Sequence, residues 1–166
     1  FVLARGFTEE GPFKPVASVP NNNRDSLLSF VDSSSSPEQG PVYYVLNAID
    51  QCDAVFASSG ISKTIHLSGE VDDYKYSHDL HWDGYQGWEY FNANVLRYQM
   101  FRKLTVDDGY SWVNNISPAW RYYTDDIQND LKYGGEFCYR IRAVQDSSGA
   151  YPYIDTAWSN VYCFQS

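Results

Sequence analysis

The chain has 166 residues and a net charge of −9, and 43% of its residues are hydrophobic. This length provides one sizeable domain or two small ones, and no apolar run approaches the ~20 residues that a membrane helix needs. The acidic balance argues against nucleic acid or an anionic membrane surface as partner, because both are negatively charged. Fifteen Tyr and five Trp against a single Met are typical of β-structure.

Short apolar segments separated by turn-forming residues run through the first half of the chain. The composition predicts a loop at residues 33–40, and the predicted strands cover residues 1–7, 13–19, 26–32, 42–48 and 61–67. The chain opens in mid-strand and has no initiator Met, signal peptide or targeting tail. We therefore expect it to be an excerpt from a longer protein.

The second half repeats this order of elements. Its predicted strands cover residues 78–85, 96–104, 110–116, 121–127, 135–144 and 158–164. Residues 30–32 match 123–125, and residues 46–50 match 141–145, an internal repeat with an offset of about 93–97 residues. The sequence thus predicts an all-β chain of two tandem β-sandwich modules, 1–67 and 68–166. The first module lacks its opening strands, which either precede Phe1 in the parent chain or come from another segment.

The strand at residues 135–144 organises the second module. Phe137, Tyr139, Ile141 and Ala143 alternate along it and share one predicted buried face. A turn-rich segment leads to the strand at 158–164, which predicts a long antiparallel hairpin.

The register of this hairpin can be tested on its cysteines. Facing residues in an antiparallel pair have a constant sum of residue numbers, which for Cys138 and Cys163 is 301 and centres the turn at 150.5, in the turn-forming segment. The register predicts a Cys138–Cys163 disulfide on the side away from the core; the alternative is two free thiols. A paired cysteine favours an oxidising compartment, and Cys52 has no evident partner.

The second half carries a family likeness. The segments concerned are Leu80-His-Trp82, Tyr98-Gln-Met-Phe-Arg-Lys103, Phe137-Cys-Tyr-Arg-Ile-Arg-Ala143 and Trp158-Ser-Asn160. Together they resemble a fibronectin type III domain, which implies that Trp82 fills the core. That family often has a corner Tyr at the start of its sixth strand, where this chain has Val42 and Phe137. The departure implies a fold that relies more on apolar packing.

A narrower likeness covers nearly the whole chain. Its segments are 82–88, 123–126, 135–139 and 159–163, with 48–52 and 64–67 in the first module. They resemble the fibronectin-like modules that precede the C-terminal sorting domain of gliding-motility-associated surface proteins of Bacteroidota. The resemblance implies export by the type IX secretion machinery and an outer-membrane complex, display at the cell surface, and a sorting domain just after Ser166.

No pattern in the sequence indicates an active site. His78 and His81 are three residues apart and lie on opposite faces of a strand, a poor arrangement for one metal ion. No serine-hydrolase, zinc-protease or phosphate-loop motif occurs. The acidic pairs at 72–73, 107–108 and 125–126 are better explained as turn and strand-end residues than as a Ca²⁺ site. We therefore expect no enzyme, metal or cofactor.

Aromatic residues form the one set of candidate ligand contacts. Exposed rings on sandwich loops can stack on sugars, although such rings more often cover the core or pack on a neighbouring module. The candidates for a ligand-facing role are Tyr85, Trp88, Trp112, Trp120 and Tyr151.

Three roles fit these features. We expect a non-catalytic stalk of a secreted, cell-surface adhesin, with neighbouring modules as partners. The alternative is an accessory module of a secreted polysaccharide-degrading enzyme that binds surface polysaccharide. A third hypothesis is a passenger held by the export machinery.

Overall fold

Strands are the dominant regular secondary structure of the protein. The computed structural model describes residues 1–19, 29–89, 93–146 and 154–165. Within the described residues, the short 3-10 helices η1 (Pro37–Gln39) and η3 (Leu131–Tyr133) accompany the strands. Within the described ranges no helix is long and apolar enough to cross a membrane. The predicted all-β fold class is confirmed.

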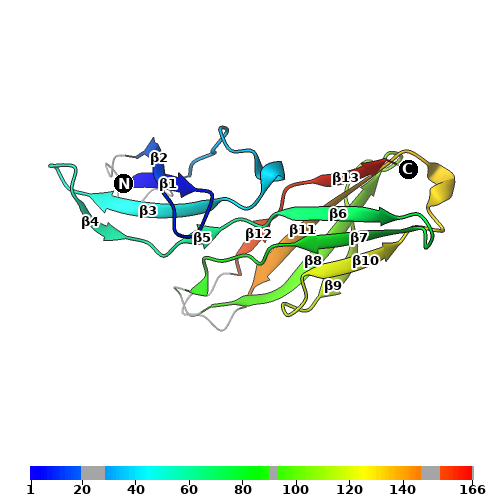
Figure 1. The fold of residues 1–166 in the computed structure, drawn as a ribbon. Helices are drawn as coiled ribbons and strands as arrows, with labels where there is room; N and C mark the ends of the chain where they lie inside the picture. The colour runs from blue at the N-terminus through cyan, green and yellow to red at the C-terminus, as the bar shows by residue number, and fades with distance from the viewer. Residues whose placement is uncertain (20–28, 90–92, 147–153, 166) are drawn as a thin grey trace.

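The second half forms a sandwich of two antiparallel sheets. Its strands are β6 (Leu67–Asp72), β7 (Ser77–Trp82), β8 (Val95–Leu104), β9 (Ser111–Ile116), β10 (Tyr122–Asp126), β11 (Glu136–Gln145), β12 (Thr156–Trp158) and β13 (Tyr162–Gln165). One sheet has the order β10-β7-β6, and the other has the order β12-β11-β8-β9 with β13 also paired to β11 (Figure 1).

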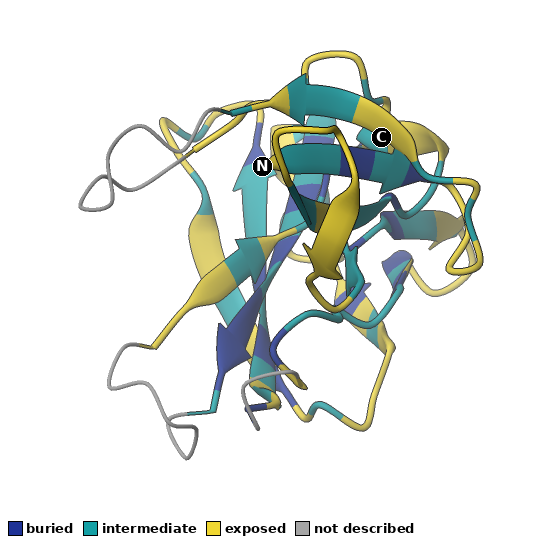
Figure 2. Ribbon diagram, turned by 90° about the vertical axis from the view of Figure 1, so that its left-hand side faces the viewer, coloured by how far each residue is buried: buried dark blue, intermediate teal, exposed yellow. Residues whose placement is uncertain are grey.

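The core of the sandwich lies between these two sheets. In Figure 2 the dark blue buried stretches lie mostly along strands, while the loops are largely exposed. The four alternating residues predicted for the buried face of β11 are all 0% exposed. They meet Leu80 and Trp82 of the opposite sheet in one hydrophobic cluster. Trp82 is 5% exposed, which agrees with the core position implied by the resemblance.

The first half contains one antiparallel sheet in its described residues. Its strands are β1 (Val2–Gly6), β2 (Lys14–Ser18), β3 (Tyr43–Ile49), β4 (Val55–Ser58) and β5 (Ser62–Lys63). Their order is β2-β1-β3-β4 with β5 also paired to β3. This is the order of β9-β8-β11-β12 with β13 paired to β11, so the two halves repeat in space as well as in sequence.

A serine contact supports the same correspondence. In the second half, Ser159 accepts a hydrogen bond on Oγ from the backbone N–H of Ile141 at 2.9 Å and donates its own N–H to the Ile141 carbonyl. In the first half, Ser59 makes the same two bonds with Leu46. Leu46 therefore occupies the place of Ile141 in the repeat.

In the part of the chain that the structure describes, the face of the first-half sheet that carries Leu46 is not covered by another sheet, whereas the equivalent face of the five-stranded sheet in the second half is covered. Leu46 is 42% exposed, whereas Ile141 is 0% exposed. Among the described residues no second sheet lies over β1 and β3. This agrees with the expectation that the first sandwich lacks its opening strands.

Several predicted boundaries differ from the structure. The predicted strand at 26–32 lies partly outside the described residues, and its described part, 29–32, is irregular. Strands β4 and β6 were not predicted, because neither segment alternates clearly between apolar and polar residues. The predicted module boundary after residue 67 falls inside β6, since Leu67 begins that strand and lies in the core of the second sandwich.

The two halves meet end to end (Figure 1). A single β-bridge joins Lys63 of the first half to Gln86 of the second, with the Lys63 N–H donating to the Gln86 carbonyl at 2.9 Å. The Gln86 side chain also donates to Glu9 at 3.3 Å. His66, between the halves, contacts the Glu38 carbonyl through Nε2 at 3.2 Å.

Candidate functional site

The predicted ligand-facing aromatics divide into buried and exposed rings. Trp88 is 4% exposed and belongs to the core, so the prediction that it faces a ligand is wrong. Tyr85 packs on Trp88 with ring centroids 4.3 Å apart, and burial raises its pKa to about 12. Trp112 and Trp120 are more than half exposed. Tyr151 lies outside the described residues.

Trp112 lines a cavity at one edge of the sandwich. The cavity has a volume of about 540 Å³ and lies between the start of β9 and helix η3. Tyr133 contributes a second half-exposed ring, and Ser111, Asp107 and Asp130 contribute polar groups. Aromatic faces beside hydroxyl and carboxylate groups are the combination that sugars require, since a sugar ring has apolar C–H faces and polar hydroxyl edges.

Trp120 lies in a shallower hollow along the same strand edge. It packs edge-to-face on Tyr122 with centroids 5.3 Å apart. Asn114, Asn115 and Thr124 line the hollow with them. Trp112 and Trp120 are therefore associated with separate depressions, one at each end of β9.

A buried polar network crosses the second sandwich from sheet to sheet. Arg102 donates to Asp125 at 2.7 Å and to Asp130 at 2.5 Å. Tyr139 donates its hydroxyl proton to the same Asp125 oxygen at 2.8 Å. Because that proton is used, His78 must donate its Nδ1–H to the Tyr139 oxygen, at 2.8 Å. Donation thus runs from His78 through Tyr139 to Asp125, and Asp125 also accepts from Arg102.

The His78–Tyr139 end of this network is shielded from solvent. His78 is 1% exposed, and its ring stacks on Phe164 at 4.1 Å. Burial lowers the pKa of His78, and burial together with the Asp125 charge raises the pKa of Tyr139. Both residues therefore hold their neutral forms, and a substrate has no route to them without opening the two sheets. His81 is exposed on the opposite face, as the spacing predicts.

The network adds buried hydrogen bonds to the apolar packing expected where the corner tyrosine is absent. Phe137 occupies the position expected for that tyrosine, but Tyr139, two residues further along β11, makes the buried hydrogen bond instead. The first half repeats the arrangement: Arg5 donates to Asp32 at 2.7 Å, and Tyr44 donates to the same oxygen at 3.0 Å. Burial opposes ionisation of Asp32, but hydrogen bonds from Ser34, Tyr44 and Arg5 hold its pKa below the ordinary value.

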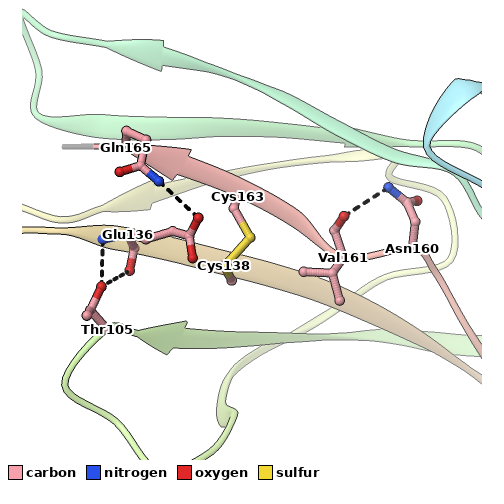
Figure 3. The surroundings of a disulfide bond; sticks show 7 residues. All are labelled: Thr105, Glu136, Cys138, Asn160, Val161, Cys163 and Gln165. Atoms are coloured by element: carbon pink, nitrogen blue, oxygen red, sulfur yellow. Dashed lines mark hydrogen bonds between the residues drawn. A yellow bond between two sulfur atoms is a disulfide. The ribbon is translucent and has the colours of Figure 1, made fainter.

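The predicted disulfide is present. Cys138 and Cys163 are directly paired residues of β11 and β13, joined by an S–S bond of 2.08 Å (Figure 3). The register of β13 therefore has the predicted sum of 301. Glu136 lies beside the two sulfurs, but their mutual bond leaves this group a single carboxylate to offer a metal ion. Cys52 is a free, exposed thiol.

Sequence reasoning missed one surface feature, which we call the arginine–aromatic ladder: Tyr110, Arg140, Trp158, Arg142 and Phe101. The Arg140 guanidinium carbon lies 4.2 Å from the ring centroids of both Tyr110 and Trp158. Arg142 lies 5.0 Å from Trp158 and 5.2 Å from Phe101. The available signal was the alternation of β11, which places both arginines on its outer face, but the aromatic neighbours come from three other segments.

Comparisons with known proteins leave the family open. No family model matches the chain, and no curated protein matches it. One solved structure with a likeness is pectate lyase Pel3 from Pectobacterium carotovorum, at a TM-score of 0.46 and 17% identity. The match covers 62% of this chain and 27% of the lyase, and a likeness of this strength carries no argument about fold or function.

The structure defines an all-β protein with a disulfide-bonded β-sandwich and a repeated half. The disulfide fits a protein that resides outside the cytoplasm.

Proposed function

We propose that this chain is a non-catalytic spacer of a large secreted adhesin at the cell surface. The observation that carries the proposal is the repeat. The two halves share the same strand order, each contains its own Arg–Asp–Tyr network, and they lie end to end. Repeated modules joined in series extend a chain away from its anchor. In the parent protein the segment would precede a type IX sorting domain and serve gliding motility, as the sequence resemblance implies.

The internal construction supports a structural role. Among the described residues of the second sandwich, the buried groups His78, Tyr139 and Asp125 bond to one another and to Arg102. The disulfide joins neighbouring strands of the same sheet, which suits a module exposed to an oxidising exterior. Partners under this proposal are neighbouring modules and, during export, the secretion machinery with its outer-membrane complex.

The proposal can be tested in the organism that makes the parent protein. Intact cells are treated with a protease, and peptides of residues 1–166 released into the medium are identified by mass spectrometry. We expect release from wild-type cells and none from cells that lack the type IX secretion machinery. Equal release from both, or protection of the segment in intact wild-type cells, would contradict the proposal.

A second candidate function is that of a glycan-binding accessory module. The cavity between Trp112 and Tyr133 favours it. The matched test compares Trp112→Ala with Trp120→Ala, since both rings are about half exposed but only Trp112 lines the cavity. Binding of a soluble neutral glycan that is lost in the first variant alone would support this function, and unchanged binding in both would oppose it.

A further inference from the structure

The arginine–aromatic ladder lies on a sheet whose charge is opposite to that of the chain. Strands β8, β9, β11, β12 and β13 carry five cations, Arg97, Arg102, Lys103, Arg140 and Arg142, against one acid, Glu136. Strands β6, β7 and β10 carry five acids and no Lys or Arg. The five-stranded sheet is therefore cationic by four charges in a protein whose net charge is −9.

Most of this positive charge is on the outer face. Arg102 turns inward to Asp125, but Arg140 and Arg142 alternate with the buried residues Tyr139 and Ile141. Arg97 and Lys103 likewise flank buried residues of β8. The ladder consequently presents cations and flat rings on one continuous surface.

Arg140 has hydrogen-bonding capacity that the protein does not use. Within the described residues it makes no ion pair and no hydrogen bond; its Nε atom is buried without a partner, so the Nη groups are the donors left for a ligand. Arg142, by contrast, donates Nε and an Nη group to Gln99 at 3.0 and 2.6 Å. A guanidinium held between two rings keeps its N–H groups in the plane between them, where a carboxylate can accept two parallel bonds.

We propose that the ladder binds a carboxylate-bearing sugar, such as a uronic acid residue of an acidic polysaccharide. The carboxylate would accept hydrogen bonds from Arg140, and the apolar face of the sugar ring would pack on Trp158, which is 40% exposed. This ligand uses both components of the surface, whereas a neutral sugar uses only the rings. The inference concerns a surface separate from the cavity of Tyr133 and does not depend on the spacer function.

The charge of the whole chain restricts the ligand further. Repulsion from a net charge of −9 disfavours a dense polyanion such as nucleic acid, which gains most of its affinity from many phosphate contacts. A single carboxylate at contact distance is affected less, because salt screens charges further away than about 8 Å at physiological ionic strength.

The test is an NMR titration of the 166-residue chain with two tetrasaccharides of identical linkage. One is the tetramer of β-1,4-linked glucuronic acid, and the other is the tetramer of β-1,4-linked glucose. We expect the acidic tetramer alone to shift the Trp158 indole and Arg140 Nε signals. Equal shifts with the neutral tetramer, or no shifts at about 10 mM acidic tetramer, would overturn the proposal.

Variants assign the binding to the ladder. Arg140→Gln should weaken the affinity at least about tenfold, as expected for the loss of a charge-assisted hydrogen bond. Arg140→Lys keeps the charge without the planar guanidinium, and it should also weaken binding. Lys14→Gln removes one positive charge from the first half and should leave the affinity unchanged. Full affinity in both Arg140 variants, with thermal unfolding as in the wild type, would overturn the proposal.

Two other occupants are distinguished in the same experiment. A second copy could place its acidic three-stranded sheet on the ladder, so sedimentation velocity is measured without sugar. If the chain associates with increasing concentration, Arg140→Gln abolishes this association and the acidic tetramer gives no response, the ladder binds a second copy of the chain and not a sugar. If single-stranded DNA binds as tightly as the acidic tetramer, the ladder binds anions non-specifically and the proposal of a sugar site is wrong.

Discussion

Tyr139 connects the two sheets of the second sandwich through one hydroxyl group. It accepts a hydrogen bond from His78 of the three-stranded sheet and donates one to Asp125 of the same sheet, while its own backbone belongs to β11. Asp125 also binds Arg102 of β8, so a carboxylate from one sheet receives donors from the other. Each buried group thus satisfies its neighbour, and the removal of one leaves another unpaired.

Replacement of Tyr139 by Phe should therefore lower the free energy of unfolding by about 1–3 kcal/mol, because Asp125 and His78 each lose a partner. Tyr44→Phe is the matched change in the first half, where Asp32 keeps bonds from Arg5 and Ser34 and Tyr44 is less buried than Tyr139. Urea unfolding of both variants measures the difference. A larger loss in Tyr44→Phe would show that the buried network of the second half is not the more important one.

His78 should make stability depend on pH. Burial lowers its pKa from the ordinary 6.5, so the unfolded chain takes up a proton that the folded chain resists. The free energy of unfolding should then fall as the pH drops below about 6.5, by at most about 1.4 kcal/mol per pH unit. Urea unfolding between pH 7 and pH 5 measures this slope. The exposed residue provides the control: His81→Gln should keep the slope and His78→Phe should flatten it, and the reverse result would refute the assignment.

At the level of strands, the repeat supplies pairs of equivalent positions in different environments. Ile141 and Leu46 make the same contacts with Ser159 and Ser59, but only Ile141 is covered by an opposite sheet. The sequence patterns of β3 and β11 are alike, and the two strands occupy equivalent positions in the repeat. Ile141 and Leu46 should contribute differently to the free energy of unfolding, because the burial of each side chain depends on what packs over its sheet.

Ile141→Ala should lower the free energy of unfolding by about 2–5 kcal/mol, since it leaves a cavity in a closed core. Leu46→Ala should lower it by less than about 1 kcal/mol in this chain, because the side chain already contacts solvent. Thermal unfolding of the two variants compares them directly. Similar losses in both would mean that the inner face of the first sheet is covered in solution.

The disulfide links β11 to β13 across a separation of 25 residues. Its removal in the double variant Cys138→Ser, Cys163→Ser should lower the free energy of unfolding by about 2–4 kcal/mol, chiefly through the greater freedom of the unfolded chain. Denaturant unfolding checks this value. Thiol titration in denaturant should give one free thiol, Cys52, before reduction and three afterwards; three before reduction would contradict the bond.

At the scale of the whole molecule, two features stand out: the end-to-end arrangement of the halves and the opposite charge of the two sheets of the sandwich. The contacts between the halves include the Lys63–Gln86 bridge, the bond between Gln86 and Glu9, and the contact of His66 with the Glu38 carbonyl. Polar contacts of this kind keep the angle between the halves only while the connecting segment remains short.

Two glycines inserted between Thr64 and Ile65 should loosen this connection. We expect small-angle X-ray scattering to give a broader distribution of distances than for the wild type, because a longer flexible link no longer keeps the bridge in register. Far-UV circular dichroism should stay unchanged, since both sheets keep their own hydrogen bonds. An unchanged distribution of distances would show that the halves are held by more than the bridge.

The sequence by itself determined the all-β fold, the alternation of β11, the repeat and the Cys138–Cys163 pair. These depend on local spacing and on strand register, both of which are readable from residue numbers. Only the tertiary structure decided that Trp88 is buried and Trp112 exposed, that Tyr139 joins His78 and Asp125, and that Arg140 lies between Tyr110 and Trp158. Such contacts join segments far apart in the chain, and their partners depend on how the two sheets pack and on which strands lie side by side.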